Sequence, residues 1–391
     1  MNDLMCLIFK LICNVLNSQE EFSDSEKIYI KNNLKILYAI SKKHDIAHLV
    51  GYSLISGKII NKYGDEKFYS LFNQAQMMAI YRYEKINYAF NEISNALEEN
   101  EIEFIPLKGA ILREYYPEPW MRTSCDIDIL VRNSDIENVI GLLCKKCCCS
   151  RGKDCTTHDY NLVYANEVHL ELHYSLTQDG KLPQADEILC DIWEYSGEKQ
   201  GFNFNKELKN EIFILYHLAH MAKHFLIGGC GIRSFIDLTL ILRKMEYDTV
   251  LLNDLIKRAG LTKFYESLLI LLDVWLNNAE HTVLTLQMEN FILTGGVYGT
   301  ARNSAAIKAG KGESKLKTLI KLIFLSRENL EIIYPKLKKH PNLLFFYQIK
   351  RWFNIFNRDK RKKIKNIVNA RKSVKQQEIN LVGEMIKQLE L

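Results

Sequence analysis

Apolar residues spaced three and four positions apart dominate both ends of the chain. The spacing is regular in "NNLKILYAISKKHDIAHLVGYSLI" (32–55) and in "FYSLFNQAQMMAIYRYEKINYAFNEISNALEEN" (68–100), and it returns from about residue 206 onward. Only six prolines interrupt the whole sequence. The pattern predicts one helical region over residues 1–98 and a second over residues 181–391.

Between these regions, over residues 99–180, the apolar period changes to two. This alternation predicts strands in "EFIPL", "DIDILV", "NLVYA" and "EVHLELHYSL", the last two pairing antiparallel. "KGAILREYY" is predicted to form a turn at Gly109 followed by a helix, and "NSDIENVIGLLCKK" a helix capped by Asn133 and Ser134. The predicted fold is therefore α+β and mostly helical, with a small mixed sheet between two helical regions.

Two aspartates, Asp126 and Asp128, interrupt the apolar strand "DIDILV". Ionised carboxylates are costly in such a setting unless a cation or hydrogen bonds compensate them. Residues two apart share one face of a strand, so both aspartates point the same way. If "VHLELHY" is the neighbouring strand, Glu171 joins them, with His169 and His173 on the same face. Three carboxylates on one face are typical of a Mg²⁺ site completed by water and phosphate oxygens.

Gly109 is the second candidate feature. A glycine between a strand and a helix allows close approach of the backbone, and a helix N-terminus favours a phosphate. Lys108 and Arg122 would add charge-assisted contacts to anionic oxygens. We therefore interpret Lys108, Gly109 and Arg122 as part of a phosphate-binding turn.

A third constellation lies in "YHLAHMAKHFLIGGCGIRSFIDL". His217, His220 and His224 share one helix face, with Lys223 near its edge, whereas Arg233 and Asp237 are four apart and are predicted to pair. We interpret Lys223, His224 and Arg233 as substrate or nucleotide contacts. Structural packing and a zinc site are the alternatives.

The segment "TGGVYGTARN" contains three glycines, Gly295, Gly296 and Gly299. No strand is predicted before it and no Gly-Lys-Ser follows, so it matches neither a dinucleotide-binding nor a P-loop pattern. We predict a loop between helices.

Composition limits the class of protein without selecting one. With 391 residues, 47% hydrophobic and 25% charged, the chain has room for two or three domains. Lys10 interrupts the apolar N-terminus, which is predicted to be a buried helix rather than a signal peptide, and no run is long enough to cross a membrane. These features and ten cysteines favour a cytoplasmic protein with free thiols. Cys144, Cys147, Cys155 and His158 have a zinc-like spacing, although free cysteines are often buried hydrophobes.

Positive charge gathers near the C-terminus. Residues 336–375 contain fourteen Lys or Arg and a single acid, Asp359, whereas the whole chain carries only +5. Such a segment can bind nucleic acid or an anionic membrane, but a solvated helix face is the plainer interpretation. An apolar stripe that includes Ile379, Val382 and Ile386 is predicted to pin the segment to the body of the protein.

Seven segments, in order, resemble the uncharacterised bacterial nucleotidyltransferase family within the DNA polymerase β superfamily. They lie between about residues 35 and 355 and read "FIPLKGAIL", "YYPEPWMRTSCDIDILV", "VHLELHYSL", "HLAHMAKHF", "GIRSFIDL", "FILTGGVYGTARN" and "YPKLKKHPNLLFFYQIKRW". The most specific part is the Lys-Gly turn with the Asp-x-Asp strand. In the wider superfamily the turn is Gly-Ser, whereas Ala110 follows Gly109 here.

The resemblance implies a polymerase-β-like sheet, two divalent ions (Mg²⁺, with Mn²⁺ possible) and transfer of a nucleoside monophosphate from an NTP. It makes Asp126, Asp128 and Glu171 the metal ligands and catalytic residues, and Lys108 with Gly109 the phosphate turn. Replacing either aspartate by Asn should then abolish turnover and leave the fold intact.

The acceptor stays open at this point. It is a small molecule or sugar-like hydroxyl in the first hypothesis, and RNA or protein docked on residues 336–375 in the second. The third hypothesis is a non-catalytic interaction protein that retains the fold.

Overall fold

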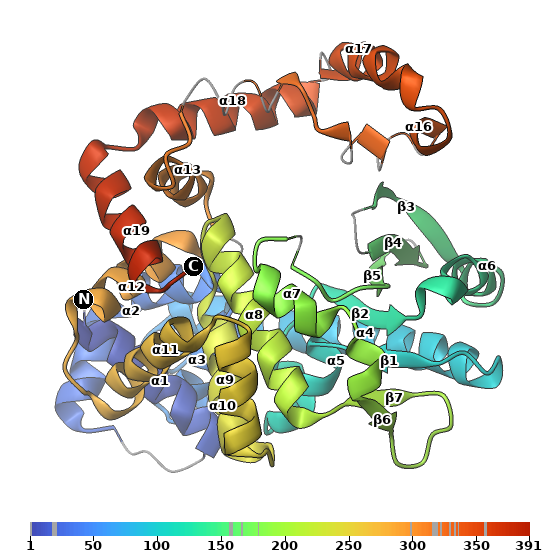
Figure 1. Cartoon of the computed structure of the whole chain (residues 1–391). Helices are drawn as coiled ribbons and strands as arrows, with labels where there is room; N and C mark the ends of the chain where they lie inside the picture. Colours follow the sequence, from blue (N-terminus) through green and yellow to red (C-terminus); the bar gives the residue numbers. More distant parts are fainter. Residues whose placement is uncertain are drawn as a thin grey trace.

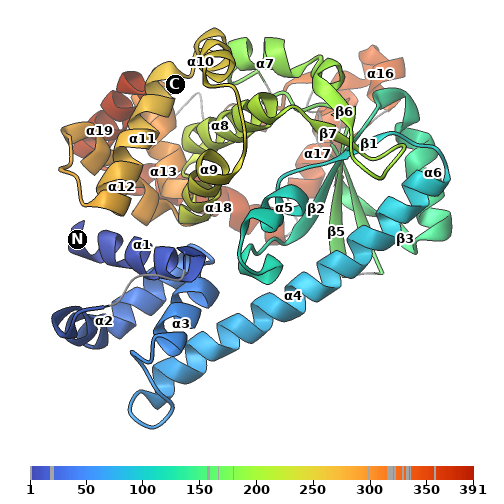
Figure 2. The ribbon, with the colours of Figure 1, turned by 90° about the horizontal axis from the view of Figure 1, so that it is seen from below.

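The computed structural model describes residues 2–17, 22–155, 159–165, 167–178, 180–297, 299–314, 320, 323–327, 330–331, 334, 336–355 and 358–391. Four helices form the N-terminal part, as predicted: α1 (Asn2–Asn17), α2 (Asp24–Lys43), α3 (Ala47–Ser56) and α4 (Glu66–Glu99). Ser23 and Glu26 form a capping box that starts α2. The long α4 leaves this group and runs beneath the central sheet (Figure 2).

The central sheet has five strands in the order β1-β2-β5-β4-β3. The strands are β1 (Phe104–Pro106), β2 (Asp126–Val131), β3 (Cys149–Cys155), β4 (Asp159–Tyr164) and β5 (Val168–His173). Only the β2–β5 pair is parallel within these strands, and the β4–β5 pair is antiparallel as predicted. The predicted mixed sheet is therefore confirmed, with β2 and β5 side by side at its centre.

One face of the sheet is covered by α4 and by α6 (Ile136–Lys146), as Figures 1 and 2 show. Alternate residues of the two central strands enter this core: Ile127, Ile129, Val131, Val168, Leu170 and Leu172. Because side chains alternate along a strand, the intervening polar residues project from the opposite face. The hydrophobic pattern thus decides which face carries the aspartates.

The helix predicted after Gly109 is shorter than expected. Only one turn forms, α5 (Gly109–Leu112), before a 3₁₀ turn at Arg113–Tyr115. Tyr116 precedes Pro117 and is extended, as residues before proline usually are. A single turn has little dipole, so the N-terminus of α5 attracts a phosphate less than that of a longer helix would.

Other local predictions also need correction. Asn133 and Ser134 do not cap α6: they lie in a 3₁₀ turn, Asn133–Asp135, and α6 begins at Ile136 without a side-chain cap. The sequence pattern predicts neither strand β3 nor the hairpin of β6 (Ser196–Glu198) and β7 (Lys206–Leu208). These short strands lack a clear alternation of apolar and polar residues. Pairing with neighbouring strands, rather than their own sequence, keeps them extended.

The C-terminal part is helical, as predicted. Its helices are α7 (Pro183–Leu189), α8 (Asn210–Ile227), α9 (Ile232–Lys244), α10 (Thr249–Arg258), α11 (Thr262–Asn277), α12 (Val283–Gly295), α13 (Ala301–Gly310), α16 (Lys336–Lys339), α17 (Leu344–Ile355), α18 (Arg358–Ser373) and α19 (Gln376–Gln388). One large core joins residues of α1 to α3 with residues of α8 to α12 and α19. The two ends of the chain are therefore packed together.

The last helix is held against the body, as its apolar stripe predicts. Met385, Ile386 and Leu389 are buried in the large core. Gly383 lies against Gly310 of α13, where an added Cβ on Gly310 would come within 2.8 Å of the Gly383 Cα. Among the basic residues before α19, Lys365, Lys372 and Lys375 are exposed. In Figure 1, α18 crosses above α13 and leads to α17 at the other end.

Two glycine-rich loops pack against each other between these helices. An added Cβ at Gly229, in the loop after α8, would lie 3.1 Å from the Gly299 Cα, and one at Gly231 would lie 2.9 Å from the Val297 Cα. Thr300 donates its backbone N–H to the Gly228 carbonyl at 3.3 Å. Gly296 and Gly299 therefore lie in a loop between α12 and α13, as predicted, whereas Gly295 is the last residue of α12, and the glycines allow close contact between two backbones.

Within the part of the chain that the structure describes, no helix is both long and apolar enough to cross a membrane. The cysteines whose side chains are described are all free, in agreement with the expectation of free thiols.

Candidate active site

The polar face of β2 and β5 carries the candidate site. The parallel register places Asp126 beside His169 and Asp128 beside Glu171, so both predicted aspartates and the predicted glutamate share one face. A pocket of about 240 Å³ lies over this face. It is lined by Lys108, Asp126, Glu171, His173, Ser175, Leu176, Thr177, Gln178, Tyr216, His220, Lys223 and His224.

Asp128 is the most strongly held carboxylate. It is buried, and its Oδ1 accepts hydrogen bonds from Lys108 Nζ at 2.9 Å and from His173 Nε2 at 2.9 Å. Burial alone would raise the pKa of Asp128, but the charge of Lys108 and the hydrogen bond from His173 outweigh it and hold the pKa below its usual range. Asp128 is therefore ionised in the folded protein.

Asp126 and Glu171 are shifted in the opposite direction. Burial and then the charge of Asp128 raise the pKa of Asp126. The same two causes, in the same order, raise the pKa of Glu171 to about 7. Three carboxylates near one another cannot all ionise cheaply, so one is held by cations and the other two retain protons more readily.

Lys108 supplies the local positive charge. Burial alone would lower its pKa, but attraction by Asp128 outweighs burial and raises the pKa above its usual value. Its backbone has φ +40° and ψ −106°, a conformation that non-glycine residues rarely adopt. The backbone N–H of Leu107 also donates to the Asp128 carbonyl at 3.0 Å. A strained turn tied to β2 thus directs the lysine at the carboxylate.

Gly109 is required by packing rather than by its φ angle. A Cβ at this position would lie 2.9 Å from Arg122 Nη1 and 3.3 Å from the Ser124 side chain. The Gly109 carbonyl accepts a hydrogen bond from Arg113 Nε at 2.7 Å. The glycine therefore lets the turn after β1 approach the segment that precedes β2.

Arg122 and Arg233 do not line the pocket. Arg122 is buried, and its Nη2 pairs with Asp237 Oδ2 at 2.9 Å. Arg233 Nη1 pairs with Asp45 Oδ2 at 3.2 Å and donates to the Thr123 carbonyl at 2.9 Å. The ion pair predicted between Arg233 and Asp237 is therefore wrong. The Asp237 carboxylate instead binds Arg122 and accepts a hydrogen bond from the Tyr116 hydroxyl. The role of both arginines in nucleotide binding stays a prediction.

Helix α8 forms the opposite wall of the pocket. His220 and His224 face each other with their Nε2 atoms 2.9 Å apart, and Lys223 also lines the pocket. Burial, and then the charge of Lys108, lower the pKa of both histidines, that of His224 to about 4. His217 instead turns to the Ser234 carbonyl at 3.1 Å and is not among the residues that line the pocket.

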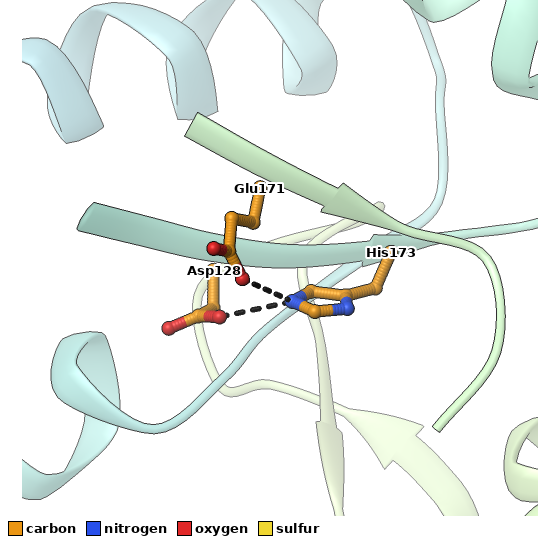
Figure 3. A group of neighbouring side chains, drawn as sticks. All are labelled: Asp128, Glu171 and His173. Atoms are coloured by element: carbon orange, nitrogen blue, oxygen red, sulfur yellow. Dashed lines mark hydrogen bonds and ion pairs between the residues drawn. The ribbon is translucent and has the colours of Figure 1, made fainter. Parts of the chain in front are cut away.

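Two side chains near the carboxylates have no role assigned from the sequence. His173 has its Nε2 2.9 Å from Asp128 Oδ1 and 3.6 Å from Glu171 Oε2, and Figure 3 shows both carboxylates directed at this nitrogen. Tyr216 lines the pocket, and burial raises its pKa to about 12. Both could have been found from spacing, because His173 follows Glu171 by two on a strand and Tyr216 precedes His220 by four on a helix.

We call Asp128, Glu171 and His173 the carboxylate–histidine cluster. It is the group of three possible metal ligands found in the described residues, with ligand atoms within 4.8 Å of one another. Asp126 shares the face and the pocket but is not part of this group. The donor set of oxygen and imidazole nitrogen fits a divalent cation.

The alternative of a zinc site at Cys144, Cys147, Cys155 and His158 stays untested, because only two of the four side chains are described. Cys144 is exposed and Cys147 is buried, with its thiol near the Glu92 carbonyl at 3.7 Å. The Cys155 side chain and His158 lie outside the residues that the structure describes.

The fold and the site together define an α+β protein whose sheet carries carboxylates on one face. These carboxylates could hold a divalent cation opposite the lysine and histidines of α8. The chain belongs to a family of uncharacterised nucleotidyltransferases, whose model matches residues 31–277. Membership assigns it a general role in nucleotidyl transfer with an NTP as substrate. No curated protein and no solved structure matches the chain.

The family match contains every predicted site residue, from Lys108 to Arg233. It ends before α12, so two segments that carried part of the resemblance, 291–303 and 334–352, lie outside it. The basic residues 336–375 also lie outside the matched region.

Proposed function

We propose that the protein transfers a nucleoside monophosphate from an NTP to a hydroxyl of a small-molecule or sugar-like acceptor, and that it needs Mg²⁺ or Mn²⁺. The supporting observation is that carboxylates face a lysine and two imidazoles across one pocket. Asp126 and Glu171 line it from the sheet side with Lys108, whereas Lys223, His220 and His224 line it from α8. A metal-bound triphosphate presents both a cation and anionic oxygens, so it matches both walls.

The pocket volume limits how much of an NTP the pocket can enclose. About 240 Å³ is below the range of roughly 300–1,000 Å³ that holds a drug-sized ligand. We infer that the enclosed part receives the phosphates and that the base and the acceptor lie toward its mouth. Asp126, Asp128 and Glu171 would hold the ions in a polymerase-β-like arrangement, and the ions would neutralise charge on the triphosphate.

The transfer is an in-line displacement. The acceptor oxygen forms a bond to the α-phosphorus, the bond from that phosphorus to the bridging oxygen of the β-phosphate breaks, and pyrophosphate leaves with the electron pair. The acceptor hydroxyl loses its proton to Glu171, a carboxylate that lines the pocket and can act as the general base. Lys108 stays on Asp128 and keeps that carboxylate ionised.

The test is to incubate the purified full chain with each labelled NTP, a divalent ion and a small-molecule cell extract. We expect pyrophosphate release and a product heavier by one nucleoside monophosphate, both lost in the Asp128→Asn variant. Product confined to an RNA or protein fraction, with salt-sensitive yield, would favour the second candidate acceptor, for which the basic residues 336–375 would be the docking surface. No pyrophosphate release from any NTP would contradict the proposal.

A further inference from the structure

His173 lies at a point where two carboxylates compete for one nitrogen. Its Nε2 is 2.9 Å from Asp128 Oδ1 and 3.6 Å from Glu171 Oε2 (Figure 3). A neutral imidazole has at most one proton at Nε2 and can satisfy only one of the two acceptors. The imidazole side chain is only 5% exposed, so water has little access to it. A neutral His173 therefore leaves one of the two carboxylates without a hydrogen bond from this nitrogen.

The three ligand atoms are spaced as the ligands of a single cation are. Oxygen and nitrogen ligands at about 2.1 Å from an ion are separated from each other by about 3 Å in an octahedral site. The 2.9 Å and 3.6 Å distances around His173 are close to this value. The two separations around His173 therefore match those between neighbouring ligands of one metal ion, once Nε2 has lost the proton that it shares with Asp128.

A further carboxylate lies beside the histidine. Asp159 of β4 lies directly across from His173 in the β4–β5 ladder and is buried. Metal-bound histidines commonly have such an outer carboxylate, which orients the ring and makes its nitrogen a better ligand. The sequence pattern does not point to Asp159, because it is far from the Asp-x-Asp pair along the chain.

We propose that His173 is a direct metal ligand together with Asp128 and Glu171, with Asp159 as its positioning residue, so that the site prefers Mn²⁺ to Mg²⁺. This deepens the proposed function, since it names the ion of the same site. Imidazole is a good ligand for first-row transition ions, whereas Mg²⁺ is bound almost entirely by oxygen. The all-carboxylate set expected from the resemblance would lack this preference.

The test is pulsed EPR of the full-length protein loaded with Mn²⁺ in the absence of nucleotide. We expect a ¹⁴N coupling from a coordinated imidazole in the parent protein, its loss in His173→Gln, and its retention in His169→Gln. His169 is the matched control, because it lies on the same face of β5 and is exposed. Competition with Mg²⁺ should show that the parent binds Mn²⁺ at least tenfold more tightly than His173→Gln does, while Mg²⁺ binding changes less.

The parent spectrum alone can overturn the proposal, whether or not the variants fold. A Mn²⁺ signal without ¹⁴N coupling would exclude the imidazole as a ligand, and a coupling that persists in folded His173→Gln would assign it to another histidine, such as His220 or His224. Asp159→Asn, which keeps the ligand, should retain the coupling with weaker Mn²⁺ binding. A ¹⁴N coupling without NTP turnover would support His173 as a ligand and contradict the proposed function. NTP turnover without a ¹⁴N coupling would support the proposed function and contradict His173 as a ligand.

Discussion

At the scale of the residue, the two aspartates of β2 have different environments although they share a face. Asp128 has two donors, Lys108 and His173, and its pKa is held low, whereas burial and the charge of Asp128 raise the pKa of Asp126. From the sequence, the two positions are equivalent. The structure distinguishes them, because Lys108 in the strained turn donates a hydrogen bond to Asp128.

This difference predicts opposite effects of the two amide substitutions on the metal-free protein. Asp128→Asn should lower the free energy of unfolding by about 2 kcal/mol, because it weakens the bonds to a partly buried lysine and a buried histidine. Asp126→Asn should leave it unchanged or raise it, since it removes a disfavoured charge. Urea unfolding at pH 7.5 with a chelator measures both, and equal destabilisation by the two would contradict this assignment.

Glu171 makes the stability of the metal-free protein depend on pH. Its folded pKa of about 7 lies above the ordinary value of 4.5, so between these values the folded state binds more protons than the unfolded state. Stability contributed by this group is therefore present below about pH 4.5 and is lost as the pH rises through 7.

The Glu171→Gln variant should remove this dependence. We expect its metal-free melting temperature to match that of the parent at pH 5 and to exceed it at pH 8. Adding Mn²⁺ at pH 8 should stabilise the parent more than the variant, because the parent supplies the charged ligand. A difference between the two melting temperatures that is the same at both pH values would show that the carboxyl is not protonated near neutrality.

At the scale of the element, glycines allow connections that other residues would block. The loop after α8 and the loop between α12 and α13 touch through their backbones, and Gly299 is at the closest point. An added Cβ there would lie 2.5 Å from the Gly228 carbonyl carbon. The contact holds the C-terminal end of α8, and with it His224 and the wall of the pocket, against α13.

Gly299→Ala should therefore be strongly destabilising. Gly312 is a matched control, because its φ of +78° is close to the +76° of Gly299, but an added Cβ there would have no atom of the described residues within 4 Å. Both substitutions carry the conformational cost of a positive φ, about 1–2 kcal/mol, and only Gly299→Ala adds overlap. We expect thermal unfolding to show Gly299→Ala less stable by about 2 kcal/mol beyond Gly312→Ala. Similar losses for both would mean that the loops can separate freely.

At the scale of the whole molecule, the site is assembled from parts that lie far apart in the sequence. The sheet contributes the carboxylates, α8 contributes the nitrogen-rich wall, and α9 holds the segment before β2 through the Arg122–Asp237 pair. Both partners of that pair are nearly fully buried, with side-chain exposures of 8% and 2%. A buried pair of this kind fixes the position of one unit against another more than it adds stability by itself.

Breaking this connection should be costly. Asp237→Ala leaves Arg122 buried without its partner and should lower the free energy of unfolding by about 3–5 kcal/mol. The exposed Arg258–Asp254 pair of α10 is the control, and Asp254→Ala should change stability by less than about 1 kcal/mol. Denaturant unfolding of both variants checks this, and a small effect of Asp237→Ala would show that water reaches the pair after all.

The sequence by itself determined the class of fold and the face that carries the carboxylates. Helical spacing at both ends and alternation in β2 and β5 are local properties, so α1 to α4, α8 to α13 and the central strands follow from them. The Asp126, Asp128 and Glu171 face follows too, because one apolar face must enter the core.

Only the tertiary structure decided which groups meet across that face. It placed Lys108 and His173 on the same oxygen of Asp128, turned Asp237 from Arg233 to Arg122, and put Asp159 across from His173. Short elements such as α5 and β3 were likewise decided by neighbours rather than by propensity. The physical reason is that charge partners are chosen by distance in space, and strand pairing and helix packing set those distances only once the chain is folded.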